Sequence, residues 1–190
     1  KPHPLWSRGL GDVYKRQILA LTFTFLSCSK DDEPEHVHEH ELMTTLNVTL
    51  TSATAGNVTM SFQDLDTDGP NPPSISVSGN LKSETLYMGS VEILNESETP
   101  TENVTLEIIE EANEHQFFFT SSSGFEVDVT ATDSDSNGNP LGREFNLQTH
   151  SAGSGTFTIT LIHMPNKPNS GLSSAGGATD IEVTFSLTVE

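Results

Sequence analysis

Residues 181–189 read Ile-Glu-Val-Thr-Phe-Ser-Leu-Thr-Val, a strict alternation of apolar and polar side chains. Successive side chains of a β-strand point to opposite faces of a sheet, so one face of this segment would be buried and the other exposed to water. The apolar positions hold β-branched, aromatic and leucine side chains, which suit a half-buried strand. The segment therefore predicts a strand that packs on a hydrophobic core.

Similar alternation recurs along the chain between clusters of Gly, Pro, Asn and Asp. It predicts eight further strands near residues 42–51, 57–63, 74–78, 86–94, 116–121, 124–132, 143–149 and 155–163. About nine short strands with frequent turn residues are typical of a β-sandwich. We therefore expect residues 42–190 to form one all-β domain, an Ig-like or jelly-roll-like sandwich.

One segment has helical periodicity instead. Residues 99–102 read Thr-Pro-Thr-Glu, which places a capping residue, a proline and a glutamate at the positions that favour a helix start. Val104, Ile108 and Ala112 follow at a spacing of four residues. The pattern predicts one short amphipathic helix over about 100–114.

Two parts of the chain on either side of this helix resemble each other. In each, a five-residue strand pattern leads into an acidic loop, at residues 58–69 and again at 127–138. A short strand, a glycine turn at Gly89 or Gly155 and a longer strand then follow. The similarity predicts an internal duplication of a four-strand unit within one sandwich.

The acidic loops are candidate calcium sites. Ca²⁺ takes six to eight oxygen ligands, and side chains at alternate positions of a tight loop can converge on one ion. The second loop matches a calcium-loop pattern most fully, and its candidate ligands are Asp133, Asp135, Asn137, Asn139 and Glu144. The first loop offers Asp64, Asp66 and Asp68. The alternative is that Asp, Asn and Gly only form turns here.

The N-terminal part has the features of an export signal. Residues 18–27 form an apolar run too short to span a membrane, and Lys15 and Arg16 precede it. Residues 25–28, Phe-Leu-Ser-Cys, resemble the lipobox of bacterial lipoproteins, which implies lipidation of Cys28. Residues 1–17 resemble a translated sequencing adapter, so we interpret them as an artefact and exclude them from the fold.

Residues 28–41 are predicted to be a disordered, charged tether behind the lipid anchor. The acidic run that follows Cys28 resembles that of surface-exported lipoproteins of the Bacteroidota, which implies the outer membrane, on its periplasmic face or at the cell surface. His36, His38 and His40 alternate with acidic residues in this tether. They could bind Zn²⁺ or Cu²⁺ if the segment curls around the ion, and otherwise form a solvated linker.

The charge of the chain restricts its partners. The formal net charge is -19, and from Cys28 onward 26 acidic and 4 basic residues give -22. Such a surface repels phosphate backbones, which excludes nucleic acid as a partner. The single cysteine excludes an intrachain disulfide.

Catalytic motifs are scarce. No nucleophile elbow, phosphate-binding loop or His-Glu-x-x-His motif occurs. His115, His150 and His163 are scattered along the chain, and a site shared by them is possible only if the fold brings them together. We therefore expect a protein that is not an enzyme.

The mature sequence resembles a group of small uncharacterised flavobacterial lipoproteins. The likeness rests on residues 35–46, on 94–96 and 114–118 around the predicted helix, and on 180–185. Some members carry the label "type 1 periplasmic binding fold superfamily protein". That label implies an α/β fold, whereas the alternation in this chain predicts strands.

Together these features predict a lipid-anchored binding or adhesion module of the cell envelope, stabilised by calcium, with an unknown envelope or extracellular ligand. One alternative is a zinc- or copper-handling lipoprotein that uses the histidines of the tether. A second alternative is a hydrolase with an unrecognised site.

Overall fold

The structure, a computed structural model, describes residues 42–67 and 69–190, which belong to one compact unit. It confirms the nine predicted strands, most of them within two or three residues of the expected bounds. They are β1 (Thr45–Ser52), β2 (Gly56–Gln63), β3 (Ser74–Val77), β4 (Leu86–Leu94), β5 (His115–Ser121), β6 (Val127–Ala131), β7 (Glu144–Thr149), β8 (Gly153–His163) and β9 (Ala178–Val189). Two short helices, α2 (Thr105–Glu110) and α3 (Leu172–Ala175), complete the described elements.

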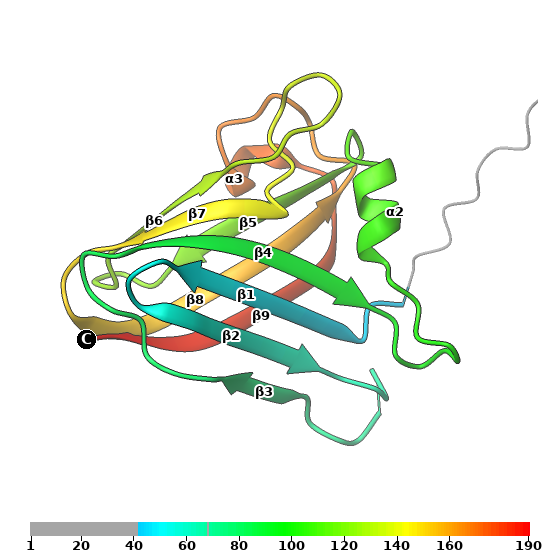
Figure 1. Cartoon of the computed structure of the whole chain (residues 1–190). Helices are drawn as coiled ribbons and strands as arrows, with labels where there is room; N and C mark the ends of the chain where they lie inside the picture. Colours follow the sequence, from blue (N-terminus) through cyan, green and yellow to red (C-terminus); the bar gives the residue numbers. More distant parts are fainter. Residues whose placement is uncertain (1–41, 68) are drawn as a thin grey trace, which may run out of the picture. The chain divides into compact units, whose positions relative to one another are not determined.

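The strands form two antiparallel sheets that face each other (Figure 1). The larger sheet has the order β3-β2-β1-β4-β7-β6, and the smaller has the order β5-β8-β9. An all-β sandwich is therefore confirmed.

The core lies between the sheets because the alternating apolar side chains of both sheets point inward. In β9 the residues at 181, 183, 185, 187 and 189 are buried, as the alternation predicted. Phe185 is fully buried, which stabilises the fold by about 1.5–3 kcal/mol relative to leaving the ring exposed. A side chain at Gly89 would meet the ring of Phe145 at 2.3 Å, so the sheet needs glycine where this ring lies against β4.

One side of the sandwich is closed by the segment between β3 and β4. Leu81 is fully buried and forms a parallel bridge with Val189 of β9. Its backbone donates to the carbonyl of Thr188 and accepts from the amide of Glu190, at 2.9 Å each. This segment therefore connects the two sheets at the end of β9.

The helix is much shorter than predicted. It spans Thr105–Glu110 instead of 100–114, because Asn95 and Glu102 pair through their backbones and hold the first predicted turn in a loop. Thr105 also bonds the backbone of Ile93 through its hydroxyl, which fixes the start of the helix against β4. The capping pattern at 99–102 therefore belongs to a turn.

The similarity predicted between the two halves of the chain is limited in the structure to two hairpins. Each acidic loop joins neighbouring antiparallel strands, β2 to β3 and β6 to β7. The following strands differ, since β4 returns to the same sheet whereas β8 belongs to the other. The predicted four-strand repeat is therefore not reproduced as a spatial unit. No helix among the described residues is long and apolar enough to cross a membrane.

Candidate functional site

Opposite the closed side, the sandwich has two edge strands, β5 and β6. In the described part of the chain β5 pairs only with β8, and β6 pairs only with β7. An antiparallel strand directs the backbone groups of alternate residues to alternate sides. The second edge of each strand is therefore a row of backbone donors and acceptors.

The hydrogen bonds of residues just outside β5 and β6 show which residues of these strands direct their backbone groups toward the gap between the two edges, called the seam below. Even-numbered residues bond the neighbouring strand, as Glu114 does to Met164 and Glu126 does to His150. The odd-numbered residues Phe119, Val127 and Val129 therefore have backbone groups on the other side. At one end of the seam the amide of Phe117 already donates to the carbonyl of Leu141, at 2.7 Å.

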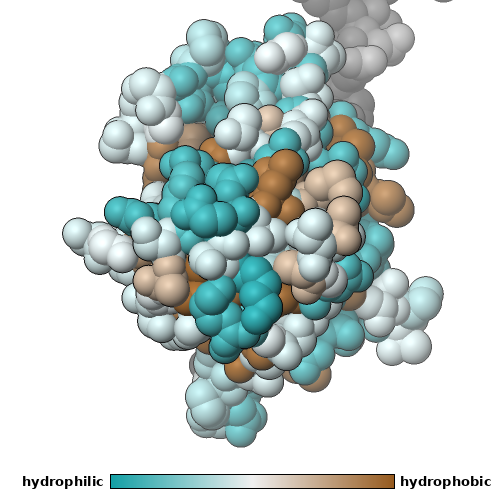
Figure 2. Space-filling view, turned by 60° about the vertical axis from the view of Figure 1, so that its left-hand side comes forward, coloured by the Kyte–Doolittle hydropathy of each residue, from teal (hydrophilic) through white to brown (hydrophobic). Residues whose placement is uncertain are grey.

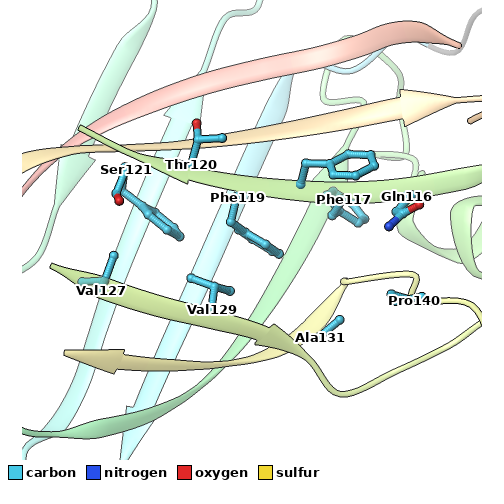
Figure 3. Close-up of a pocket in the computed structure, with 11 residues that line it drawn as sticks. Gln116, Phe117, Phe119, Thr120, Ser121, Val127, Val129, Ala131 and Pro140 are labelled. Atoms are coloured by element: carbon cyan, nitrogen blue, oxygen red, sulfur yellow. The ribbon is translucent and has the colours of Figure 1, made fainter. Parts of the chain in front are cut away.

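A groove of about 270 Å³ lies between these two edges (Figure 3). The ring of Phe119 and the side chains of Val127 and Val129 project into the space between β5 and β6. Phe119 also contacts the core rings, with centroid distances of 4.5 Å to Phe145 and 5.8 Å to Phe157. The remaining lining residues are Gln116, Phe117, Phe118, Thr120, Ser121, Ala131, Pro140 and Phe157. A groove between two strand edges, with apolar side chains and polar groups in its lining, can hold an extended chain.

A second hollow lies elsewhere on the described surface. Figure 2 shows one face on which hydrophobic side chains form separate patches among hydrophilic ones. A hollow of about 430 Å³ lies on the outer face of the large sheet, lined by residues of β1, β4 and β7. These three strands are paired on both sides, so their backbone groups are satisfied within the sheet.

The first acidic loop is an exposed turn. The Asp66 carboxylate accepts from the side-chain and backbone nitrogens of Asn71, at 2.7 and 3.3 Å. The hydrogen bond from the Asn71 side chain lowers the pKa of Asp66 below its usual range. Asp64 begins the loop, and Asp68 lies outside the described residues.

The second loop is organised around two aspartates that accept hydrogen bonds from its backbone. Asp133 accepts from the amides of Gly142 and Glu144, at 2.7 and 3.0 Å. Asp135 accepts from the amides of Asn137 and Asn139, at 2.9 and 2.8 Å. These bonds hold the turn that Gly138 permits with a φ of 83°.

A lysine ammonium lies beside the buried Asp135. Lys167 Nζ is 3.3 Å from Asp135 Oδ2, and it also donates to the carbonyls of Ala112 and His115, at 2.7 and 2.6 Å. The Asp135 side chain is completely buried and that of Lys167 is 6 % exposed. Burial lowers the pKa of Lys167, while Asp135 favours its charged form. The loop therefore already contacts a cation supplied by the chain.

The other candidate calcium ligands of this loop are directed elsewhere. Glu144 is exposed and pairs with Arg143. Asn137 donates through its side chain to Asn113, at 3.0 Å. In the described residues, neither acidic loop supplies three His, Asp or Glu side chains that converge on one point. Calcium binding by these loops remains a prediction.

The fold brings two of the scattered histidines together. His115 and His163 stack with ring centroids 4.9 Å apart, and Asp180 lies beside both. Burial lowers the pKa of His115. His150 lies apart from them, where a hydrogen bond with Asp128 at 2.8 Å raises its pKa. The alternation of apolar and polar residues predicted the strands on which His115, His163 and Asp180 lie. It did not predict that these three side chains would be neighbours.

The N-terminal candidates lie outside the described residues. They are Cys28, His36, His38 and His40, so lipidation and metal binding by the tether remain predictions. Comparisons with protein-family models, with curated proteins and with solved structures found no match to this chain.

Proposed function

We propose that this protein is a lipid-anchored, non-catalytic binding module of a bacterial cell envelope, and that its β5–β6 groove takes an extended peptide segment. One observation carries the proposal. A groove with both polar and apolar lining lies between two strand edges whose backbone groups point toward it. A ligand strand would pair with one of these edges and bury alternate side chains against the floor, which is the mode of recognition called strand addition.

The lining of the groove supports backbone pairing as the main interaction. Its residues include no carboxylate, imidazole or amine side chain, so charged groups at the floor would not select the ligand. Hydrogen bonds of the main chain would provide affinity, and the pockets beside Phe119 and Val129 would provide preference for apolar side chains. A segment that follows β6 from Val127 to Ala131 would have about five residues and a length of roughly 16 Å.

The charge around the groove favours a neutral or basic segment. Glu126, the residue before β6, and Asp128 of β6 are both exposed. The mature chain as a whole has a net charge of -22. Basic residues at the solvent-facing positions of the ligand strand would therefore be favoured over acidic ones.

Lipid on Cys28 would place this groove at the outer membrane, with residues 29–41 as the tether. A Cys28→Ala variant should move from the membrane fraction to the soluble fraction. Mass spectrometry of the wild-type protein checks the cause, since an unmodified Cys28 in the mature form would contradict the anchor.

Peptide selection tests the groove. Random 12-residue peptides displayed on phage are selected on the purified protein, and the enriched peptides are synthesised. Binding is then measured to Val129→Trp, which fills the groove, and to Thr130→Trp, the matched control with the same ring on the opposite face of β6. We expect a loss of at least about tenfold for Val129→Trp only, equal to about 1.4 kcal/mol.

Amide hydrogen exchange locates the bound peptide. The amides of Phe119, Val127 and Val129 should gain protection, because they point toward the groove. Peptides that bind both tryptophan variants equally, or protection confined to other segments, would show that this groove is not the binding site. Failure of the selection to enrich any peptide would also count against strand addition.

A further inference from the structure

At one end of the small sheet, three side chains with metal-ligating atoms meet outside the groove. His115 is the first residue of β5 and His163 is the last of β8, and the two are directly paired across the strands. Asp180 lies near the start of β9. These residues are far apart in sequence, and the pairing of β5, β8 and β9 brings them together.

A β-bulge accounts for the position of Asp180. Leu161 is opposite Ile181 and Ile162 is opposite Thr179, so Asp180 is the extra residue between them. A bulge changes the direction of a side chain relative to regular alternation. Without it, Asp180 would point to the outer face with Glu182, away from the face of His115 and His163.

The three ligand atoms are close enough together to approach one shared ion. His115 Nε2 is 3.7 Å from Asp180 Oδ2, and His163 Nδ1 is 3.9 Å from Asp180 Oδ1. Both distances exceed the hydrogen-bond range. Each residue offers one ligand atom, and these atoms lie within 4.8 Å of one another. A tetrahedral ion with bonds of about 2.0–2.1 Å separates its ligand atoms by roughly 3.4 Å, so binding would draw these atoms together by up to about 1.4 Å.

Neighbouring groups orient the two imidazoles for ligation. The backbone carbonyl of Glu111 lies 3.2 Å from His115 Nδ1 and can only accept, so it favours hydrogen on Nδ1 and a lone pair on Nε2 toward Asp180. On the other ring, Glu114 Oε2 is 4.0 Å from His163 Nε2, while Nδ1 faces Asp180. Metal-binding histidines commonly have a carbonyl or carboxylate partner on the second nitrogen, which the Glu111 carbonyl provides for His115 and which Glu114 would provide for His163 after a closer approach.

The surroundings favour a borderline metal ion. The side chains of His115, His163 and Asp180 are 7 %, 16 % and 6 % exposed. Two imidazoles suit Zn²⁺, Cu²⁺ or Ni²⁺, whereas Ca²⁺ and Mg²⁺ prefer oxygen ligands only. Three protein ligands leave one position of a tetrahedral ion for water or another ligand.

We propose that His115, His163 and Asp180 form a binding site for a divalent transition-metal ion of the Zn²⁺ class, with Glu114 as a positioning residue for His163. This site is separate from the histidines of the tether and from the acidic loops. It does not depend on the peptide groove.

The test is Zn²⁺ titration in competition with a chromophoric chelator. It uses the protein with His36, His38 and His40 all changed to Gln, so that the tether contributes no imidazole. This background should still bind one Zn²⁺ per chain. Asp180→Asn and His163→Gln should each weaken binding by about 100-fold or more, and Glu114→Gln by about 10- to 100-fold. His150→Gln, the matched control at an exposed histidine, should leave binding unchanged.

Two measurements keep the test independent of folding defects. Thermal melts show whether each variant is folded, and ¹⁵N chemical shifts of the imidazoles report ligation in the background protein itself. On adding Zn²⁺, the shifts of His115 Nε2 and His163 Nδ1 should change, and those of His150 should not. No stoichiometric Zn²⁺ binding by the background protein, or binding with unchanged shifts of His115 and His163, would overturn the proposal.

Discussion

The two acidic loops begin alike, with aspartates at alternate positions and a glycine after them, yet they have different surroundings. Asp66 is only partly buried, and its carboxylate accepts hydrogen bonds from Asn71 within the same turn. Asp135 is buried, and its carboxylate binds both the loop backbone and Lys167, 32 residues further along the chain. The difference shows that a local sequence pattern can specify a turn without specifying which cation contacts the carboxylates of that turn.

Removal of the lysine should have the largest effect. Lys167→Met keeps much of the apolar length of the side chain but leaves the buried carboxylate of Asp135 without its cation. Loss of one partner of a buried ion pair costs about 3–5 kcal/mol. Urea unfolding should show a correspondingly lower midpoint. A midpoint equal to that of the wild type would mean that Lys167 does not stabilise the second loop.

Neutralising the aspartates compares the loops directly. Asp135→Asn should lower the free energy of unfolding by about 1.5–3 kcal/mol, because hydrogen bonds to a charged group are lost in a buried site. The loss is smaller than for Lys167→Met because the Lys167 ammonium keeps the carbonyls of Ala112 and His115 as acceptors. Asp66→Asn, the matched change in the first loop, should have an effect within about 0.5 kcal/mol. The same urea titration measures both variants. Equal decreases in the free energy of unfolding for the two variants would show that the two aspartates stabilise their loops to the same extent.

The acid sensitivity of folding should depend on Asp135. Burial by itself would raise the pKa of Asp135, but hydrogen bonds from Asn139, Lys167 and Asn137 outweigh it and lower the pKa. A folded pKa below the unfolded value of about 3.9 gives stability that is fully present above that value. This stability is lost as pH falls through the folded pKa. Thermal melts between pH 5 and pH 2 should therefore fall less steeply for Asp135→Asn than for the wild type.

Added Ca²⁺ should have the smallest effect on the stability of the folded protein. The variants that lose this effect would show which loop binds the ion. If Lys167 already supplies the cation, Lys167→Met should respond more strongly to Ca²⁺ than the wild type. For a Kd of about 10⁻³ M, 10 mM Ca²⁺ would stabilise the variant by about 1.4 kcal/mol. Asp135→Asn in the same variant should abolish the gain.

Two controls complete the calcium experiment. Mg²⁺ at equal ionic strength measures charge screening, since Mg²⁺ fits such loops less well. In the wild type, Asp133→Ala with Asp135→Ala is compared with Asp64→Ala with Asp66→Ala. A Ca²⁺ response that exceeds the Mg²⁺ response and disappears in one double variant assigns a calcium site to that loop. Equal responses throughout would leave both loops as turns.

The strands and their buried faces could be predicted from the sequence because side-chain alternation is a local property. Residues 181–189 show this most clearly, since every apolar position of that segment is buried. The helix was predicted too long for the same reason. Its capping pattern is local, and the backbone pairing of Asn95 with Glu102, which delays the start of the helix to Thr105, is a contact outside the pattern.

The candidate sites were decided by tertiary structure. The alternation says which residues share a face, but strand order decides that β5 and β6 remain edges with a groove between them. His115, His163 and Asp180 meet because three strands pair and one contains a bulge, and neither the pairing nor the bulge has a marker in residue spacing. Lys167 reaches Asp135 through the path of a loop. Local periodicity determined the elements, whereas contacts between distant residues, which depend on packing of the whole chain, determined the chemistry.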